Sequence, residues 1–597
     1  MAKLIRSNTE VSEGNKAVMS DSEEKDGQNV PQIKGALLQA KGLTVHNPAG
    51  ENLLSDISFH IEPGELVSLS GLSFTGKSLL LKSLSGLMKP ARGEILIDGI
   101  DLYTNLKAFR SSIGYVPAEF AFQENLTVGE ILEAEASLRL PRRTSSQDRK
   151  QRVLSSLETA GLAKDSDQRV RKLGRIERRR LGIAVELIAN PGILLVDEIV
   201  GQLTPFEEVQ ITILLRELSR QGLTVIQVDQ RSRSAGLSDK VIFLAPGGLL
   251  AWFGPPEEAF IYLRNLVPRG VVKDLFGLRE ALEILGNPQI QQGIEWAKRF
   301  KNDPAYQKYV DDPIHSRYPD LMLQTRPLLR LRLRNSSQEK LPPPIIPRAS
   351  GFQKMILLIR REFRLLLREK RWLSMLVIPP LIALVDFVLS PATVSNPALA
   401  PIVFGLALFL VLLTSALLTE NEIFKERVVY QRETRTSSLS IPYILSKVGL
   451  VGLLAIYQGL VWTIIHFAAA GPAAGLQLLP YGITIGLIAF IGGILGLIAS
   501  ALSRKATSIT IWVLGLTLPQ LVFSGSIVPL VNLNLPFNLL SGINPSRYAL
   551  ESLLAISGNG VVTNASLLSY WSILAIMSLG LIVLLVGIQQ RATSTRP

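Results

Sequence analysis

The pattern of apolar and polar positions divides this chain into two unlike halves. Up to about residue 370, short apolar runs alternate with polar residues, as in a domain surrounded by water. From Trp372 onward long apolar runs dominate, and six of them approach the ~20 residues that a helix needs to cross a bilayer. These candidate spans lie near 372–390, 401–419, 448–470, 478–501, 509–530 and 569–589. The sequence therefore predicts an α/β domain followed by an all-α transmembrane domain of six helices.

The fifth candidate span differs from the others at its end. Ser524-Gly525-Ser526 and Pro529 interrupt its apolar run. Glycine and proline are the strongest local breakers of regular structure. Two arrangements stay open: this segment crosses the membrane, or it dips in and returns.

The first half shows an alternation of strands and helices. Short apolar runs closed by turn residues predict strands; they are 53–61, 66–69, 93–99, 112–117, 192–198 and 224–228. Helical periodicity covers 76–87 and residues 145–190. This order is typical of an α/β domain.

The segment Gly71-Leu72-Ser73-Phe74-Thr75-Gly76-Lys77-Ser78 fits the pattern G-x-x-x-x-G-K-[ST] of a phosphate-binding loop. Its glycines let backbone N–H groups turn inward around phosphate oxygens, at the amino end of a helix that continues through Leu79. Lys77 supplies a positive charge for the β- and γ-phosphates, and the Ser78 hydroxyl is a ligand for Mg²⁺. The alternative, a chance glycine-rich turn, fits poorly with a predicted strand before the loop and a helix after it.

A second predicted strand ends in two carboxylates, Asp197 and Glu198. In a nucleotide site Asp197 holds Mg²⁺ through water, and Glu198 orients or deprotonates an attacking water molecule. Two acids at a strand end are also compatible with an ordinary solvated turn. The phosphate loop upstream favours the nucleotide site, with ATP and Mg²⁺ as its cofactors.

Composition narrows the choice of partners. The net charge of +13 is compatible with binding to nucleic acid, but much of the basic excess lies beside apolar spans. The membrane surface is therefore the better partner, and six spans leave no role for nucleic acid. The chain has no cysteine, so disulfides and thiol chemistry are excluded.

Changes in composition suggest five segments. Residues 1–34 are rich in polar residues and predict a disordered tail, and 35–265 form the nucleotide-binding domain. Residues 266–350 predict a linker with short helices near 292–300 and 303–310 and a proline-rich spacer. Residues 351–371 interleave apolar and basic residues at helical spacing, which predicts an amphipathic helix on the inner membrane face. The transmembrane domain occupies 372–597.

The distribution of lysine and arginine predicts the orientation. The segments expected inside carry 16 such residues, whereas those expected outside carry only Arg547. This bias places both termini and the nucleotide-binding domain in the cytoplasm, beneath a plasma or inner membrane. Asp386 and His466 fall toward the outer ends of candidate spans, where solvation at the interface is the simpler interpretation.

Longer stretches resemble a known family. Residues 171–198 (RKLGRIERRRLGIAVELIANPGILLVDE) are similar to the signature helix and second acidic motif of ATP-binding-cassette (ABC) domains. Residues 237–248 and 252–258 resemble the end of that domain in the G subfamily of half-transporters, which place it before a type-2 exporter membrane domain. The charged segment 420–447 resembles the loop that passes motion to the membrane domain in this subfamily.

Several family motifs are degenerate here. The resemblance places Ala118 where the family has the glutamine of the Q-loop, and Gln230 where it has the switch histidine. The segment 199–204 lacks the aspartate of the D-loop. The usual signature L-S-G-G-[QE] is replaced by the residues Leu173, Gly174, Arg175, Ile176 and Glu177. Glycines let helix-start amides approach a phosphate, and Arg175 and Ile176 add bulk there, although Arg175 could itself reach a phosphate.

The resemblance implies a dimeric, ATP-driven exporter with slow hydrolysis, formed as a homodimer or as a heterodimer with another half-transporter, for a substrate that the sequence does not identify. Glu198 is the expected catalytic base. The alternative is an ATP-binding but non-hydrolysing partner or regulatory subunit of a heteromeric transporter. The lost motifs favour this alternative, and the retained Glu198 argues against it.

Overall fold

The architecture is described from a computed structural model. It describes residues 34–47, 49–118, 120–197, 203–229, 235–266, 293–316, 350–436, 440–470, 477–527, 535–557 and 564–594. Apart from Lys34, the predicted N-terminal tail lies outside these residues, as does the proline-rich spacer.

A ten-stranded sheet organises the first domain, in the order β5-β4-β1-β2-β10-β9-β3-β8-β7-β6. Its strands are β1 (Leu38–His46), β2 (Asn52–Ile61), β3 (Leu66–Gly71), β4 (Arg92–Ile97), β5 (Ile100–Asp101), β6 (Ile113–Val116), β7 (Ile193–Val196), β8 (Thr224–Val228), β9 (Lys240–Ala245) and β10 (Leu249–Gly254). The strands β3, β8, β7 and β6 are parallel neighbours. Their carboxyl ends therefore meet at one edge, where ligands bind in open α/β sheets.

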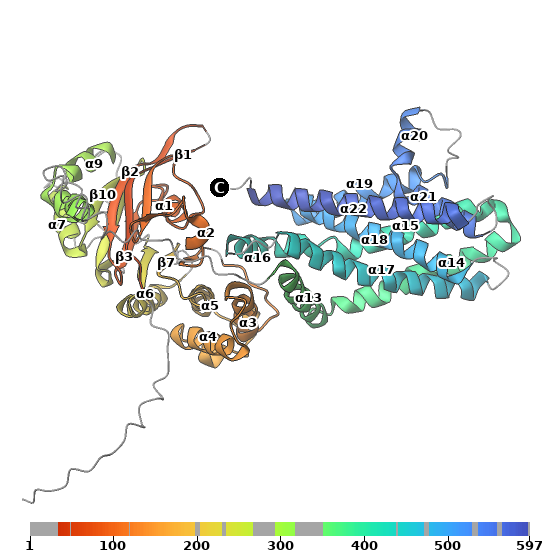
Figure 1. Ribbon diagram of the computed structural model, residues 1–597, viewed down its shortest axis with the longest axis horizontal. Coiled ribbons are helices and arrows are strands. Elements are labelled where there is room, and N and C mark those ends of the chain that lie inside the picture. The colour runs from red at the N-terminus through yellow and green to blue at the C-terminus, as the bar shows by residue number, and fades with distance from the viewer. Residues whose placement is uncertain are drawn as a thin grey trace, which may run out of the picture.

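Helices surround this sheet, and Figure 1 shows α3, α4 and α5 grouped toward the second domain. The helices are α1 (Lys77–Leu84), α2 (Leu106–Phe109), α3 (Val128–Arg139), α4 (Ser146–Thr159), α5 (Arg175–Leu187), α6 (Pro205–Arg220) and α7 (Pro256–Leu266). Capping boxes stabilise the N-termini of two of these helices. Thr127 caps α3 with Glu130, and Thr204 caps α6 with Glu207.

Short helices after α7 pack into the core of this domain. They are α9 (Gly293–Lys301), α10 (Pro304–Tyr306), the π-helical turn η6 (Gln307–Asp311) and α11 (Asp312–Ser316). Phe300 is fully buried, and its ring lies 5.3 Å from that of Trp252 on β10. These helices occur where the sequence predicts them. This part of the predicted linker nevertheless packs within the core of the first domain, because its aromatic residues cover β10.

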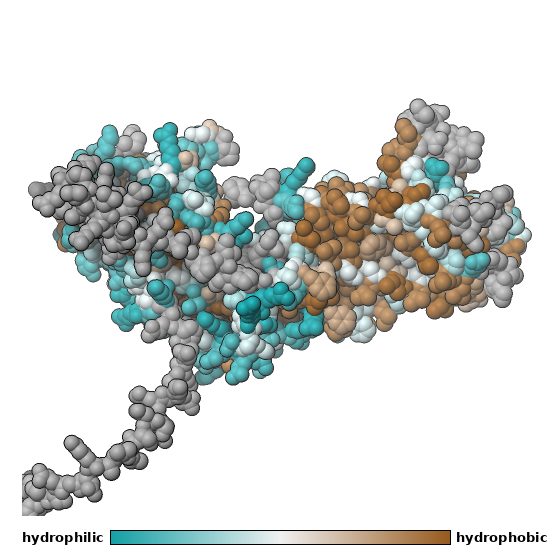
Figure 2. Space-filling model, in the orientation of Figure 1, coloured by the Kyte–Doolittle hydropathy of each residue, from teal (hydrophilic) through white to brown (hydrophobic). Residues whose placement is uncertain are grey.

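The second domain is a bundle of long helices, drawn in green to blue in Figure 1. Its elements are α13 (Gly351–Arg368), α14 (Arg371–Ser395), α15 (Ala400–Thr419), α16 (Glu422–Thr436), α17 (Ser440–Ala470), α18 (Leu478–Leu502), α19 (Ile509–Val522), α20 (Leu535–Gly542), α21 (Pro545–Ile556) and α22 (Asn564–Ser594). Figure 2 shows an apolar surface over this bundle and a hydrophilic surface over the first domain. Apolar side chains exposed around a bundle are those expected in contact with lipid.

Glycines bring α18 into backbone contact with its neighbours. A Cβ atom on Gly492 would lie 2.4 Å from the carbonyl oxygen of Leu412, and one on Gly496 would lie 2.3 Å from that of Ala416. On the other side, a Cβ atom on Gly459 of α17 would lie 2.9 Å from the carbonyl oxygen of Gly482. Small residues of this kind allow close packing of helices in membranes. Helices α15, α17 and α18 therefore form the tightly packed centre of the bundle.

Five of the described helices are long and apolar enough to cross a membrane, and they cover five of the six predicted spans. The fifth prediction, 509–530, is not met by a single helix of that length. Its helix α19 has 14 residues, about 21 Å at 1.5 Å per residue, against the ~30 Å of a hydrocarbon core. Pro519 lies inside α19, and the turn at Gly525 has a φ of 89°.

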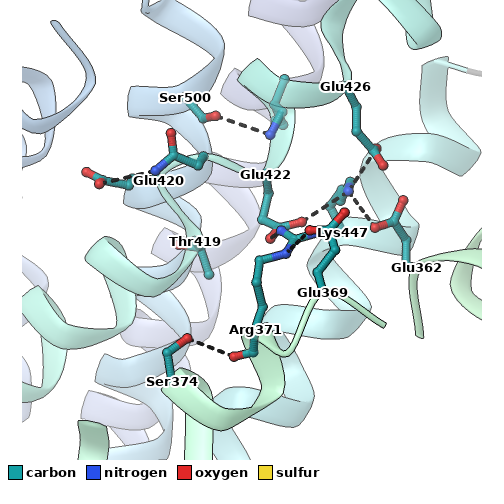
Figure 3. Close-up of polar contacts among 12 residues, drawn as sticks. Glu362, Glu369, Arg371, Ser374, Thr419, Glu420, Glu422, Glu426, Lys447 and Ser500 are labelled. Atoms are coloured by element: carbon teal, nitrogen blue, oxygen red, sulfur yellow. Dashed lines mark hydrogen bonds and ion pairs between the residues drawn. The ribbon is translucent and has the colours of Figure 1, made fainter. Parts of the chain in front are cut away.

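A buried charged cluster joins α13, α16 and α17, as Figure 3 shows. The Lys447 ammonium lies 2.7 Å from a Glu362 oxygen, 2.9 Å from Glu426 and 3.2 Å from Glu422. Its side chain is 1% exposed. Arg371 continues the cluster by binding Glu422 as well as Glu369. One ammonium thus holds three carboxylates from two helices.

Asp386 and His466 do not lie at a solvated interface, and the interpretation from the sequence is wrong for both. They are 2% and 0% exposed, and their carboxylate and imidazole nitrogen are 2.9 Å apart. The His466 ring also stacks on Tyr481 of α18 at 4.6 Å. Packing of α14 and α18 against α17 buries both groups and pairs them with each other, while Asp386 Oδ1 and His466 Nε2 have no hydrogen-bond partner among the described residues.

Candidate nucleotide-binding site

Two glycines shape the loop between β3 and α1. Gly71 ends β3 with a φ of 150°, and a Cβ atom there would lie 2.5 Å from the carbonyl oxygen of Leu244. Gly76 precedes α1 with a φ of 89°, and its Cβ atom would lie 2.6 Å from the side chain of Leu54. A side chain at either position would clash with β9 or β2, so glycine allows the loop to approach these strands closely. The loop therefore turns its backbone toward the start of α1 as a phosphate site requires.

Lys77 is buried beneath this loop. Its ammonium donates to the carbonyl oxygens of Gly71 at 2.8 Å and of Leu72 at 2.5 Å. Thr75 donates its hydroxyl to the same Leu72 carbonyl at 2.9 Å. Phe74, in contrast, is fully exposed at the tip of the loop. These bonds hold the positive charge against the loop that the sequence assigns to phosphate.

The structure brings Ser78 and Asp197 together, although 119 positions separate them. The Ser78 hydroxyl donates to one Asp197 oxygen at 3.0 Å, and the carboxylate is 4% exposed. Parallel pairing of β7 with β8, and of β8 with β3, places Asp197 beside the phosphate loop. A hydroxyl and a carboxylate are the hard oxygen donors that Mg²⁺ prefers, so the residues fit the expected metal.

The sequence reasoning missed Tyr115 at this site. Its hydroxyl donates to the second Asp197 oxygen at 3.0 Å. Tyr115 lies on β6, whose Val116 pairs with Val196, the residue before Asp197. That register carries the signal, because neighbouring parallel strands put Tyr115 next to the strand end that bears the acids.

Only some of the other predicted site residues are among those that the structure describes. Ala118 is half-buried just after β6, whereas Glu198, Gln230 and the segment 198–202 lie outside the described residues. Asp229, the neighbour of Gln230, is buried, and its backbone N–H donates to the Leu69 carbonyl at 3.0 Å. This bond places the end of β8 beside the end of β3, next to the phosphate loop.

The degenerate signature forms the start of α5. Leu173 is buried and Gly174 precedes the helix, whose first residue is the exposed Arg175; Ile176 and Glu177 are half-buried. A Cβ atom on Gly174 would lie 2.4 Å from a Glu177 carboxylate oxygen. The helix therefore presents its positive amino end and an arginine at the surface.

Replacing Gly76 by alanine is expected to destabilise the first domain and weaken nucleotide binding. The positive φ costs about 1–2 kcal/mol, and the contact with Leu54 costs about 1–3 kcal/mol more. Gly50→Ala is the matched control, because Gly50 also has a positive φ, of 87°, but nothing within 4 Å. Thermal unfolding and ATP titration of both variants check this. A Gly76→Ala protein that matches Gly50→Ala in both measurements contradicts it.

Comparisons with known proteins match both halves of the chain. A family model described as ABC transporter matches residues 54–201, and one described as ABC-2 type transporter matches residues 353–557. The chain is 26% identical to the ABC transporter ATP-binding/permease protein Rv1747 of Mycobacterium tuberculosis, over 88% of this chain and 58% of that protein. It is 33% identical to the broad substrate specificity ATP-binding cassette transporter ABCG2 of Rattus norvegicus, over 38% of this chain and 35% of that protein. It is 29% identical to ATP-binding cassette sub-family G member 5 of Mus musculus, over 55% of this chain and 50% of that protein. Each match spans less than two thirds of the relative's length.

Proposed function

Because this chain carries an ABC transporter domain followed by an ABC-2 type membrane domain, we propose that it is a half-transporter that dimerises and exports a substrate with energy from ATP. The observation that carries the proposal is the meeting of Lys77, Ser78 and Asp197 at one sheet edge, in a chain whose described residues include five helices long and apolar enough to cross a membrane. Its similarity to ABCG2 and Rv1747, which are named as transporters, supports the same conclusion.

In this proposal each site residue has one task. The loop amides and Lys77 bind the phosphates of ATP. Ser78 and Asp197 supply oxygen ligands for Mg²⁺, which neutralises phosphate charge when bound. Glu198 orients or deprotonates the attacking water. The negative charge of ATP attracts the Lys77 ammonium, which in this structure is bonded to carbonyl groups of its own loop.

A second subunit completes the site. In the proposed dimer the start of α5 from one subunit faces the phosphate loop of the other. Arg175 then meets the phosphates where the related domains have close-approach glycines. An arginine side chain lacks the fixed geometry of backbone amides, so hydrolysis is slow. The partner is a second copy of this chain or a different half-transporter.

The proposed orientation places the first domain and both termini in the cytoplasm, beneath a plasma or inner membrane. The bias of 16 lysine and arginine residues against Arg547 alone supports it. The exposed Phe352, Phe363 and Leu367 of α13 support it as well, because they form an apolar stripe suited to lie on the membrane.

The second candidate function is an ATP-binding, non-hydrolysing partner or regulatory subunit. The specific observation that favours it is the replacement of the signature and Q-loop residues, with Arg175 and Ile176 at the start of α5 and Ala118 after β6. Such a subunit closes on ATP without steady turnover, and a different subunit supplies the hydrolysis.

ATP turnover by the purified full chain in lipid separates the two candidates. For the exporter we expect slow, Mg²⁺-dependent turnover that Glu198→Gln abolishes while ATP still binds. Glu217→Gln is the matched control, a carboxylate on α6 that the proposal leaves out of the site, and it should keep turnover. Binding without turnover in the parent chain supports the regulatory subunit and rules out a homodimeric pump.

A further inference from the structure

A series of polar contacts begins at the Asp197 carboxylate and leaves the nucleotide site through β6. Asp197 accepts the Tyr115 hydroxyl at 3.0 Å. The backbone N–H of the same Tyr115 donates to a Glu186 oxygen on α5 at 3.4 Å. Glu186 in turn accepts two hydrogen bonds from the Arg139 guanidinium, at 2.9 and 3.0 Å. Asp197 is thus linked to the end of α3 through one residue of β6.

The same series of polar contacts continues into the second domain. Arg139 donates through Nε to Glu135 at 2.9 Å, and Glu135 binds Arg432 of α16. Glu135, Arg139 and Arg432 are 3%, 5% and 6% exposed. Burial tends to raise the pKa of Glu135, but the charges of Arg432 and Arg139 outweigh it and hold that pKa below its ordinary value. The carboxylate therefore stays ionised between the two guanidinium groups.

Arg432 also contacts the loop that follows Ala118. Its Nη1 donates to the Ala121 carbonyl at 2.9 Å. Its guanidinium lies 4.9 Å from the ring centre of Phe120 and 5.4 Å from that of Phe122. The two rings stack on each other at 4.6 Å. This loop is where the resemblance expects a glutamine, and α16 lies in the segment that resembles the family's motion-transmitting loop.

We infer that Tyr115 is a positioning residue that links the metal site to α16 and takes over the connection that the absent glutamine leaves open. The inference rests on the proposed function, because it assumes that Asp197 responds to a bound metal. A turn of the Asp197 carboxylate moves the Tyr115 hydroxyl and, with it, β6. The backbone bond to Glu186 passes this shift to Arg139, Glu135 and α16.

The physical argument is that these buried charges stay together. Separating the members of a buried ion pair is strongly unfavourable, because it leaves an uncompensated charge away from water. A small displacement of β6 is therefore expected to move Glu135 and Arg432 as a group and to leave their bonds intact. Contacts in series do not by themselves prove coupling, so the test has to measure a response at α16.

Hydrogen exchange of residues 422–436 in the full chain, in lipid nanodiscs with and without saturating Mg·ATP, provides that test. We expect Mg·ATP to change exchange in this segment of the parent chain and Tyr115→Phe to lose most of that change. Tyr103→Phe is the matched control, because the Tyr103 hydroxyl also bonds within the domain, to the Ser83 carbonyl at 2.8 Å, but lies off this chain of contacts. It should respond like the parent.

A second variant interrupts this series of polar contacts close to α16. Glu135→Gln should lose the same part of the response, and Tyr115→Phe/Glu135→Gln should lose no more than either single variant. A parent-like response in Tyr115→Phe overturns the inference, as does a parent chain that binds Mg·ATP without any change at α16. A parent chain that binds no ATP overturns the proposed function, and the inference with it.

Discussion

Lys77→Ala is expected to weaken ATP binding by roughly 10- to 150-fold, because a hydrogen bond to a charged group contributes about 1.5–3 kcal/mol. The Lys77 ammonium is the buried cation that contacts the phosphate loop directly, through Gly71 and Leu72. Alanine removes that charge from the place where phosphate oxygens are expected, and it leaves both carbonyl groups without this donor. Titration of the purified chain with a fluorescent ATP analogue measures the effect.

Lys82→Ala is the control for this prediction. Lys82 lies on the same helix, α1, in its last turn, and has no place in the site. Its replacement should leave the affinity for ATP unchanged. If Lys77→Ala also binds ATP like the parent chain, the assignment of the loop to phosphate is wrong. The fold and the membrane assignment do not depend on this result.

Lys447→Met is expected to destabilise the second domain by about 3–5 kcal/mol, since it leaves buried carboxylates without their cation. Lys447 contacts Glu362, Glu422 and Glu426, and it is 1% exposed. With the ammonium gone, Glu362 and Glu426 lose the cation that lies between them, so their buried like charges repel, whereas Glu422 keeps its contact with Arg371. The yield of folded protein and its thermal unfolding in detergent measure the loss. Lys425→Met, an exposed lysine on α16, should change stability by no more than about 0.5 kcal/mol.

The pH dependence of this variant gives a sharper check. Burial raises the pKa of Glu362 to about 7, against the opposing charge of Lys447. Without Lys447 only the weaker effect of Arg361 opposes that rise, and the charge of Glu426 adds to it, so Glu362 takes up a proton at still higher pH. We therefore expect the defect of Lys447→Met to shrink as the pH falls from 8 to 5. A defect that is equal across this range contradicts the account of repelling carboxylates.

The sequence predicts best those features that depend on a few consecutive residues. The phosphate loop is one, because Gly71, Gly76 and Lys77 meet requirements set by their own backbone and neighbours. The pairing of Ser78 with Asp197 also follows, since parallel strands end at one edge of the sheet. The predicted strands match β2, β3, β4, β6, β7 and β8 closely.

Features that depend on which elements pack together cannot be predicted from the sequence in this way. Asp386 and His466 look like interfacial residues until α14 and α17 are seen side by side. Tyr115 looks like an ordinary strand residue until the register of β6 and β7 is known. For the fifth span, Ser524-Gly525-Ser526 marks an interruption in the sequence, but only the structure shows that its helix, α19, ends at Val522.

The glycine contacts of α18 limit how the membrane domain can move. Gly492 and Gly496 press backbone on backbone against α15, and Gly459 does the same between α17 and α18. At these three points no side chain separates the backbones, so there the helices have little freedom to slide past one another. We therefore expect the three helices to move as one rigid unit. In the proposed exporter, a passage for the substrate is then expected to open around this unit, where α14, α19 and α22 pack against it.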